Sequence, residues 1–159
     1  MNANTKQKGF TIIEVVLVLA IAALIFLMVF IALPALQRGQ RDTGRKQDAN
    51  TVITALNTWK GNHRGALPDI EKAAELTSFQ NDYVKQLGQY DVGEDGTFKW
   101  ENEESPSFDQ GDELNQIGIV LGVQCNDTGT DITTDGASRR SAAVVITLEA
   151  SEARVCIDG

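Results

Sequence analysis

The chain has 159 residues, of which 22 are acidic and 14 are basic, giving a formal net charge of −8. That length suits one domain. The charge is unevenly distributed: residues 34–64 carry a net +4, whereas residues 65–159 carry 19 acidic against six basic side chains, a net −13. This acidic part argues against direct nucleic-acid binding, which needs clustered Lys and Arg. We interpret its one basic doublet, Arg139–Arg140, as a solvated turn.

The longest apolar run is Val15–Leu33, 19 residues without a polar side chain. That is about the length a helix needs to cross a hydrocarbon core. One carboxylate, Glu14, stands at the start of the run, where an acid inside a membrane costs roughly 2.5–3.5 kcal/mol. A segment that only anchored the chain would have no reason to carry it. A secretory signal cleaved after the run is disfavoured because the run is too long and Pro34 spoils the cleavage pattern.

A short, positively charged leader precedes the apolar run. The elements there are Lys6 and Lys8 in the leader, Gly9 at its end, then Phe10, Thr11 and Glu14. Together with the apolar run, these residues resemble the N-terminus of type IV pilins and their pseudopilin relatives. The resemblance implies that a prepilin peptidase cleaves between Gly9 and Phe10 and methylates the amine of Phe10. It also implies that the apolar helix stays in the mature protein, first in the membrane and then in a filament.

Glu14 lies one helical turn after Phe10, so its carboxylate and the α-amine of the mature protein share a helix face. No Lys, Arg or His lies between Gly9 and Arg38. The resemblance implies that the amine of a neighbouring subunit neutralises the buried acid and sets the axial register of assembly. The alternative is an acid near the helix start whose side chain reaches the membrane interface. We predict an assembly role for Glu14.

The patterns divide the chain into four parts. Residues 1–9 are a cleaved leader, residues 10–36 a transmembrane and assembly helix, and residues 37–60 the basic, amphipathic half of the same stem helix. Residues 61–159 form a globular head. The positive leader favours a cytoplasmic N-terminus, with the head outside the cytoplasmic membrane.

Pro34, Gly39 and Gly44 make the middle of the stem helix its weakest part, because proline removes a backbone donor and glycine disfavours helix. We expect a kink or local unwinding there; a complete break at the membrane surface is the alternative. Helical periodicity then returns, and the apolar stripe of Val52, Ile53, Leu56 and Trp59 should pack on a sheet. We interpret Trp59 as a core residue. We hypothesise that the stem residues Arg38, Arg41, Arg45 and Lys46 face acidic heads of neighbouring subunits.

The head reads as short helices followed by strands. We expect one short helix capped by Asp69, a second short helix or a turn over Ser78–Leu87, and a possible hairpin turn at Asp95–Gly96. His63 is interpreted as a surface residue. Four strands are expected at Thr97–Glu101, Ile117–Val123, Ala142–Glu149 and Arg154–Ile157, with an acidic loop over Glu101–Glu113. Ile117, Ile119, Leu121 and Val123 should share one face of their strand, with Gly118 and Gly122 on the other. The predicted fold is α+β, an antiparallel meander packed by one face on the stem helix.

Cys125 and Cys156 are the two cysteines. An even number in a chain that leaves the cytoplasm favours a disulfide, with two buried free thiols as the alternative. In the pilins that this chain resembles, a disulfide near the C-terminus bounds an exposed, variable loop. The enclosed loop carries Asp127, Asp131 and Asp135, weak candidates for calcium ligands whose spacing differs from an EF-hand. A solvated loop is the preferred interpretation, and we expect no cofactor.

Catalytic motifs of the common hydrolase, metalloprotease and nucleotide-binding types are missing from the sequence, so we expect no enzyme. The resemblance implies a type IV pilin, a structural subunit that a platform and an ATPase polymerise into a surface filament for adhesion, twitching motility or DNA uptake. The alternatives are a type II secretion pseudopilin or minor pilin, and a permanently membrane-anchored binding domain. The partners would be other copies of the chain, the prepilin peptidase, the assembly machinery, and the membrane before assembly.

Overall fold

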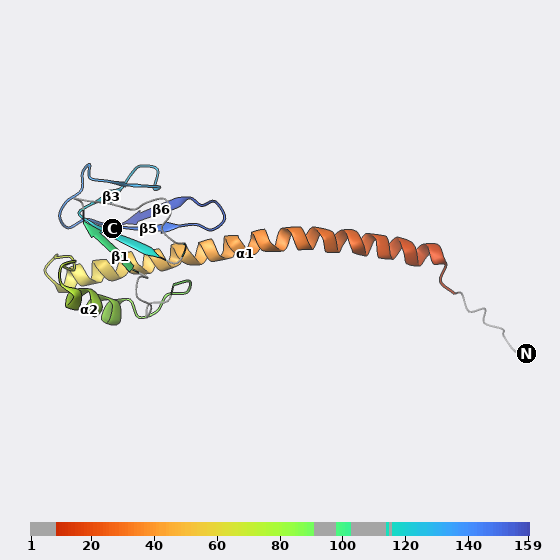
Figure 1. The fold of residues 1–159 in the computed structure, drawn as a ribbon, viewed down its shortest axis with the longest axis horizontal. Helices are drawn as coiled ribbons and strands as arrows, with labels where there is room; N and C mark the ends of the chain where they lie inside the picture. The colour runs from red at the N-terminus through yellow and green to blue at the C-terminus, as the bar shows by residue number, and fades with distance from the viewer. Residues whose placement is uncertain (1–8, 91–97, 103–113, 115) are drawn as a thin grey trace, which may run out of the picture. The chain divides into compact units, whose positions relative to one another are not determined.

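The structure is a computed structural model that describes residues 9–90, 98–102, 114 and 116–159. Its described elements, in chain order, are α1 Ile12–Asn62, α2 Ala73–Tyr83, β1 Phe98–Asn102, β2 Ile117–Leu121, β3 Gln124–Cys125, β4 Ile132–Thr133, β5 Ala142–Thr147 and β6 Arg154–Asp158 (Figure 1). The chain divides into two compact units, residues 1–37 and residues 38–159. The fold is α+β, with a long N-terminal helix and a four-stranded sheet, as the sequence predicts.

The backbone of α1 is helical without a break through Pro34, Gly39 and Gly44. The expected local unwinding is therefore wrong, and so is the alternative of a complete helix break. Apolar residues surround Pro34 in the sequence, and one missing backbone donor does not outweigh the helix propensity of its neighbours. A bend at Pro34 stays a prediction.

The main sheet has the order β1-β2-β5-β6. β5 pairs antiparallel with both β2 and β6, as the expected meander requires. β1, however, pairs parallel with β2, with Phe98 opposite Ile117 and Asn102 opposite Leu121. The prediction of a purely antiparallel sheet is thus wrong for β1. Residues 103–116 are long enough for the crossover that a parallel pair needs, which takes about a dozen residues.

Some expected elements near β1 fall differently from the prediction. Glu101 is not the start of a loop but lies inside β1, where its side chain is buried. The remainder of the expected acidic loop, to Glu113, lies outside the described residues, apart from Asn102 at the end of β1. The expected turn at Asp95–Gly96 and the expected strand residue Thr97 lie outside them as well.

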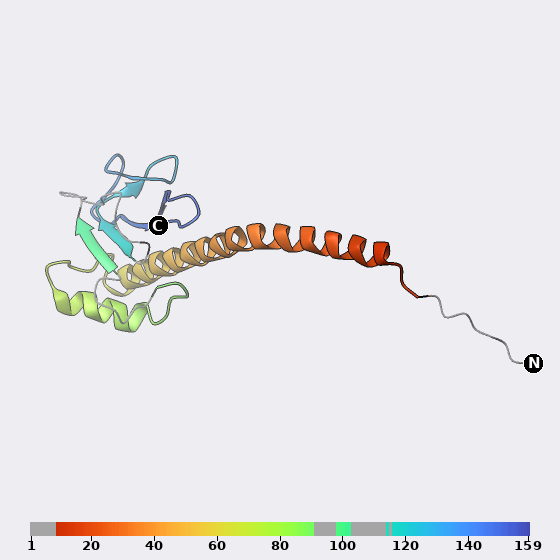
Figure 2. The same ribbon diagram turned by 45° about the vertical axis from the view of Figure 1, so that its right-hand side comes forward.

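The core of the second unit lies between α1, α2 and one face of the main sheet. The predicted stripe of Val52, Ile53, Leu56 and Trp59 is buried there. It packs with strand residues that include Ile119 and with Phe79 of α2. Figure 2 shows the C-terminal part of α1 between α2 and the strands, the same order as in Figure 1. Burying so many apolar side chains on one helix face is the main source of the stability of this unit.

One helix, α2, lies where a short helix followed by a second helix or turn is expected. It runs from Ala73 to Tyr83 and so covers the junction between them. Asp69 does not cap it: the residue before α2 is Lys72, which makes no side-chain cap bond, and Asp69 accepts a hydrogen bond from the backbone of Glu71 instead.

The other face of the sheet is covered too, by a second apolar cluster of Val120, Val123, Ala143, Val145 and Cys156. Cys125 and Ile132, from the small β3–β4 sheet, pack against it. Gly122 has φ +80 and ends β2, so Val123 joins this cluster rather than the face of Ile117 and Ile119. The expectation that Val123 shares their face is wrong, because a left-handed glycine breaks the alternation of the strand.

Candidate functional site

The residues of the predicted processing step are exposed and precede the helix. Gly9, Phe10 and Thr11 have no helical backbone, and α1 begins at Ile12. The side chain of Phe10 is 90% exposed. Lys6 and Lys8 lie outside the described residues. A non-helical peptide bond between Gly9 and Phe10 is the form that a peptidase can take into its active site.

Glu14 caps the N-terminus of α1. One carboxylate oxygen, Oε2, accepts a hydrogen bond from the backbone N–H of Thr11 at 2.9 Å and another from its hydroxyl at 2.6 Å. Thr11 and Glu14 have the Thr-x-x-Glu spacing of a capping box, and an acid in the first turn also complements the helix dipole. The sequence analysis missed this local role, although the spacing signals it. The carboxylate therefore has a partner within its own chain before any amine is released by cleavage.

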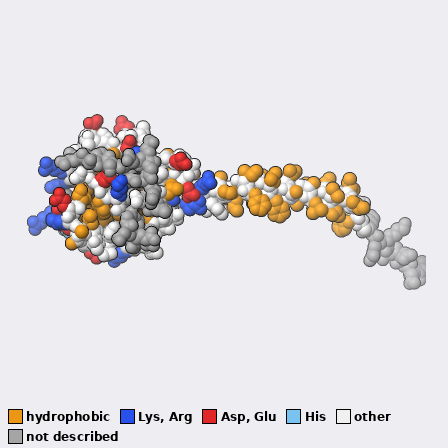
Figure 3. All heavy atoms as spheres, in the orientation of Figure 1, with side chains coloured by type: hydrophobic (Ala, Val, Ile, Leu, Met, Phe, Trp, Pro, Cys, Tyr) orange, Lys and Arg blue, Asp and Glu red, His pale blue; other side chains and the backbone are white. Residues whose placement is uncertain are grey.

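The first unit leaves its apolar side chains without protein around them. The large apolar residues between Phe10 and Leu36 are 49–90% exposed, and Figure 3 shows hydrophobic side chains all along this part of α1. α1 is long and apolar enough to cross a membrane by length and composition. So large an apolar surface requires lipid or other protein chains around it.

Comparison with known proteins agrees with these features. Residues 4–30 match the family model of the prokaryotic N-terminal methylation motif. The chain carries a type IV pilin-like class III signal peptide. This motif supports a type IV pilin-like or pseudopilin protein in general, and it implies processing by a prepilin peptidase. It also fits a membrane-anchored precursor. Neither the curated proteins nor the solved structures gave a match.

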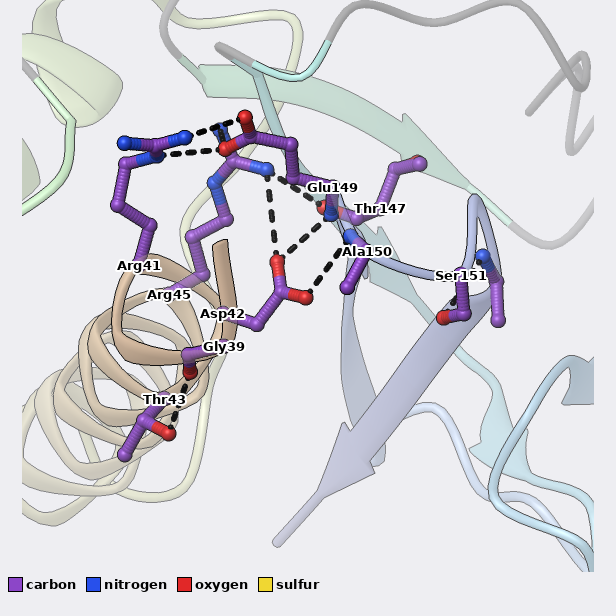
Figure 4. Close-up of polar contacts among 10 residues, drawn as sticks. Gly39, Arg41, Asp42, Thr43, Arg45, Thr147, Glu149, Ala150 and Ser151 are labelled. Atoms are coloured by element: carbon purple, nitrogen blue, oxygen red, sulfur yellow. Dashed lines mark hydrogen bonds and ion pairs between the residues drawn. The ribbon is translucent and has the colours of Figure 1, made fainter. Parts of the chain in front are cut away.

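In the second unit, Asp42 of α1 holds the turn between β5 and β6. Its carboxylate accepts backbone hydrogen bonds from Glu149 at 2.6 Å and from Ala150 at 3.0 Å (Figure 4). The guanidinium group of Arg45 lies between two carboxylates: its Nη1 is 3.8 Å from Oδ1 of Asp42, and its Nη2 is 3.9 Å from Oε2 of Glu149. Arg41 binds both carboxylate oxygens of Glu149, at 2.6 and 2.7 Å, and this hydrogen-bonded pair holds the pKa of the Glu149 carboxyl below its usual value.

Two of the four stem cations have acidic partners within the same unit. Arg41 and Arg45 both bind acids there, a pairing that the hypothesis about the basic stem did not include. Arg45 is only 6% exposed. The hypothesis remains a prediction for Arg38 and Lys46, which are exposed.

A second carboxylate of α1 holds a second loop. Asp48 accepts hydrogen bonds from the backbone N–H groups of Gly88 at 2.8 Å and Gln89 at 2.6 Å. Tyr90, the next residue, is buried, and this burial raises its pKa to about 12. A Cβ on Gly44 would lie 2.8 Å from Cγ of Gln89. Gly44, predicted as a kink residue, thus allows the loop to approach the helix closely.

The sequence analysis missed Asp42 and Asp48 as structural residues. One signal was available: Asp42, Arg45 and Ala49 continue the apolar stripe of Val52, Leu56 and Trp59 toward the N-terminus in steps of three and four residues. All six side chains are buried. Polar residues on a buried helix face need hydrogen-bond partners, and here the loops supply them. We name the pairs of backbone hydrogen bonds on Asp42 and Asp48 the carboxylate clamps.

The predicted disulfide joins Cys125 to Cys156, with a Cα–Cα distance of 5.6 Å. It links β3 to β6. Asp127, Asp131 and Asp135 do not gather into a metal site, since the described residues contain no suitable group of three ligands. Asp131 instead accepts a hydrogen bond from Ile132 and lies 3.7 Å from Arg154.

The remaining aromatic candidates have structural environments. Trp59 is 4% exposed and belongs to the core, as predicted. His63 is exposed and stacks on Trp59 with a ring-centroid distance of 3.8 Å, and its Nδ1 is 3.0 Å from the Trp59 carbonyl oxygen. Neither residue lies in a catalytic arrangement in the described part of the chain.

Proposed function

We propose that the chain is a structural subunit of a type IV pilus, stored in the cytoplasmic membrane and polymerised into a surface filament through its N-terminal helix. The observation that supports the proposal is the methylation motif at residues 4–30, which overlaps a helix whose large apolar side chains are exposed all around it. Lipid can surround such a helix before assembly, and other copies of the helix can surround it afterwards. Adhesion, twitching motility or DNA uptake would be activities of the filament.

The proposed processing has a defined chemical product. Cleavage between Gly9 and Phe10 releases the amine of Phe10, which the prepilin peptidase then methylates. The amine lies one helical turn from Glu14, and both groups are at the helix N-terminus. In a bundle of copies, the amine of one subunit is the nearest cation available to the acid of another, since no Lys, Arg or His lies between Gly9 and Arg38.

The first experiment is mass analysis of the N-terminus of the protein purified from cells. A pilin starts at a methylated Phe10. A chain that retains Met1 or the leader would contradict the proposal and favour a permanently anchored binding domain. Electron microscopy of purified surface filaments, with peptide identification, then separates a major pilin from a minor pilin or a secretion pseudopilin.

The second experiment separates charge from capping at Glu14. Glu14→Gln keeps an oxygen that can accept the hydrogen bonds of Thr11, because Gln also serves in a capping box, but it loses the charge. If Glu14 neutralises an amine, the Glu14→Gln variant inserts normally and fails to form filaments. Normal filaments from Glu14→Gln would show that capping alone explains the acid. Glu14→Leu removes both roles and should also stop assembly while insertion is retained.

A further inference from the structure

A hollow in the second unit gathers arginines on an otherwise acidic part of the chain. It has a volume of about 570 Å³ and lies between residues 64–71, which follow α1, and the residues just before β5. Arg64, Arg139 and Arg140 line it. Residues 65–159 carry a net −13, but the hollow collects two of their six basic residues together with Arg64, against two lining carboxylates, Asp69 and Glu71. We name this feature the arginine hollow.

The backbone at the end of α1 places these side chains together. Arg64 and Gly65 have φ 58 and φ +85, and the N–H of Gly65 bonds the carbonyl of Lys60 at 2.7 Å, which closes the helix end. A Cβ on Gly65 would lie 3.4 Å from the guanidinium carbon of Arg140. The turn that follows the helix therefore lies against Arg140, one of the two residues that the sequence pattern indicated as a solvated turn.

The three arginines are exposed, and in the part of the chain that the structure describes they form no ion pair. Two acids also line the hollow, Asp69 and Glu71. Asp69 is bound to Lys72 at 3.1 Å. Within the described lining, Glu71 is then the one unpaired carboxylate against three guanidinium groups. Arg41 and Arg45 differ from the arginines of the hollow because they already form ion pairs, Arg41 with Glu149 and Arg45 with Asp42 and Glu149.

We propose that the arginine hollow binds carboxylates of a second copy of this chain in the assembled filament. The inference rests on the proposed function, which brings many copies of the second unit together. Units with an excess of acids repel each other when they are packed closely. A guanidinium group binds a carboxylate through two parallel hydrogen bonds, which gives such a contact strength and a fixed geometry. Asp127 and Asp135, exposed and in no described ion pair, are carboxylates of the required kind.

The test compares two double variants of equal charge change in full-length filaments. Arg139→Gln with Arg140→Gln removes two charges from the hollow. Lys60→Gln with Lys85→Gln removes two charges outside the hollow and away from the stem residues that we expect to face neighbouring heads. We expect the arginine variant to release subunits from filaments roughly tenfold more readily at low salt, which is a modest loss for close interfacial charge pairs. The lysine variant should behave as the wild type. The difference in subunit release between the two variants should shrink at 1 M salt, where the Debye length is only about 3 Å and exposed charges are strongly screened.

Cross-linking identifies the partner directly. Arg140→Lys introduces an amine that a carbodiimide can join to a nearby carboxylate. Filaments are assembled from a mixture of light and heavy nitrogen-labelled subunits, so that a cross-link between copies contains both isotopes. Mixed-isotope peptides that join position 140 to an Asp or Glu support the proposal. Exclusively single-isotope peptides to Asp69 or Glu71 would overturn it.

The outcomes separate this inference from the proposed function. If the wild type forms no filaments, both are wrong, because no second copy is placed beside the hollow. If the wild type forms filaments that depend on Glu14, and the arginine double variant releases subunits no faster than the lysine double variant, only the inference is wrong. Normal disulfide formation and an unchanged melting temperature of the monomer exclude misfolding as the cause of any loss.

Discussion

Replacing Asp42 with Asn should destabilise the second unit strongly. Asp42 is 7% exposed, and its two carboxylate oxygens accept hydrogen bonds from the N–H groups of Glu149 and Ala150. An Asn oxygen can keep one of these bonds, whereas its NH₂ group would face the other donor. The change also removes the negative charge beside Arg45, which is 6% exposed.

The magnitude follows from the bonds that are lost or weakened. A hydrogen bond to a charged group contributes about 1.5–3 kcal/mol, roughly twice a neutral one. Asp42→Asn loses one such bond and weakens the second, and it leaves a partly buried N–H unpaired. We expect the free energy of unfolding to fall by about 2–4 kcal/mol, which lowers the melting temperature by roughly 10 °C in a unit of this size.

The measurement is thermal and urea unfolding of the full-length protein in detergent, with the disulfide intact and Trp fluorescence as the readout. Asp82→Asn is the matched control: Asp82 is exposed on α2 and accepts only the hydroxyl of Ser78, at 2.9 Å. Its effect should stay within about 0.5 kcal/mol. Hydrogen exchange should also accelerate at the amides of Glu149 and Ala150. Equal stability of both variants, with unchanged exchange at these amides, would refute the clamp.

Three further predictions concern the head and the end of the stem. Replacing Cys125 and Cys156 with Ser should lower the free energy of unfolding by about 3–4 kcal/mol, measured by urea unfolding, since the closed loop is long. Gly61→Ala should raise it by about 0.5–1 kcal/mol, because Gly61 is helical and a Cβ there meets no atom within 4 Å. The hydrogen bonds from Arg41 hold the pKa of the Glu149 carboxyl below its usual value. This pair therefore stabilises the fold above the usual pKa of a glutamate, and the stability is lost as the pH falls through the lowered pKa. Arg41→Gln should reduce the slope of melting temperature against pH in that range.

Each of these predictions has a control in the chain. Reduction of the wild type should reproduce the melting temperature of the cysteine variant, and a smaller loss on reduction would contradict the disulfide argument. Gly65→Ala should destabilise, in contrast to Gly61→Ala, because Gly65 has φ +85. Equal effects at the two glycines would contradict the backbone argument. Lys46→Gln should leave the acid slope unchanged, and the same slope in Arg41→Gln would contradict the role of the ion pair.

Local patterns in the sequence determined much of this protein. The methylation motif occupies consecutive residues, and the length of the apolar run depends on composition alone. The buried stripe of Val52, Leu56 and Trp59 follows from helical periodicity, and the four main strands follow from short apolar segments between turn residues. The disulfide was predicted from the number of cysteines and the compartment. The motif, the apolar run, the stripe and the strands depend on residues close together in the chain, so they can be predicted from the sequence directly.

Only the tertiary structure decided which distant groups meet. The alternation of side chains within β1 and within β2 does not tell which way the two strands run relative to each other, and they pair parallel. Asp42 and Asp48 find their partners in distant segments, in backbone donors of the turn at Glu149 and of the loop at Gly88. Arg41 and Arg45 bind Glu149, which is more than 100 residues away in the sequence, so no local pattern names it as their partner. Electrostatic and hydrogen-bond partners are fixed by three-dimensional packing, and a polar side chain in a sequence does not say which backbone group it will bind.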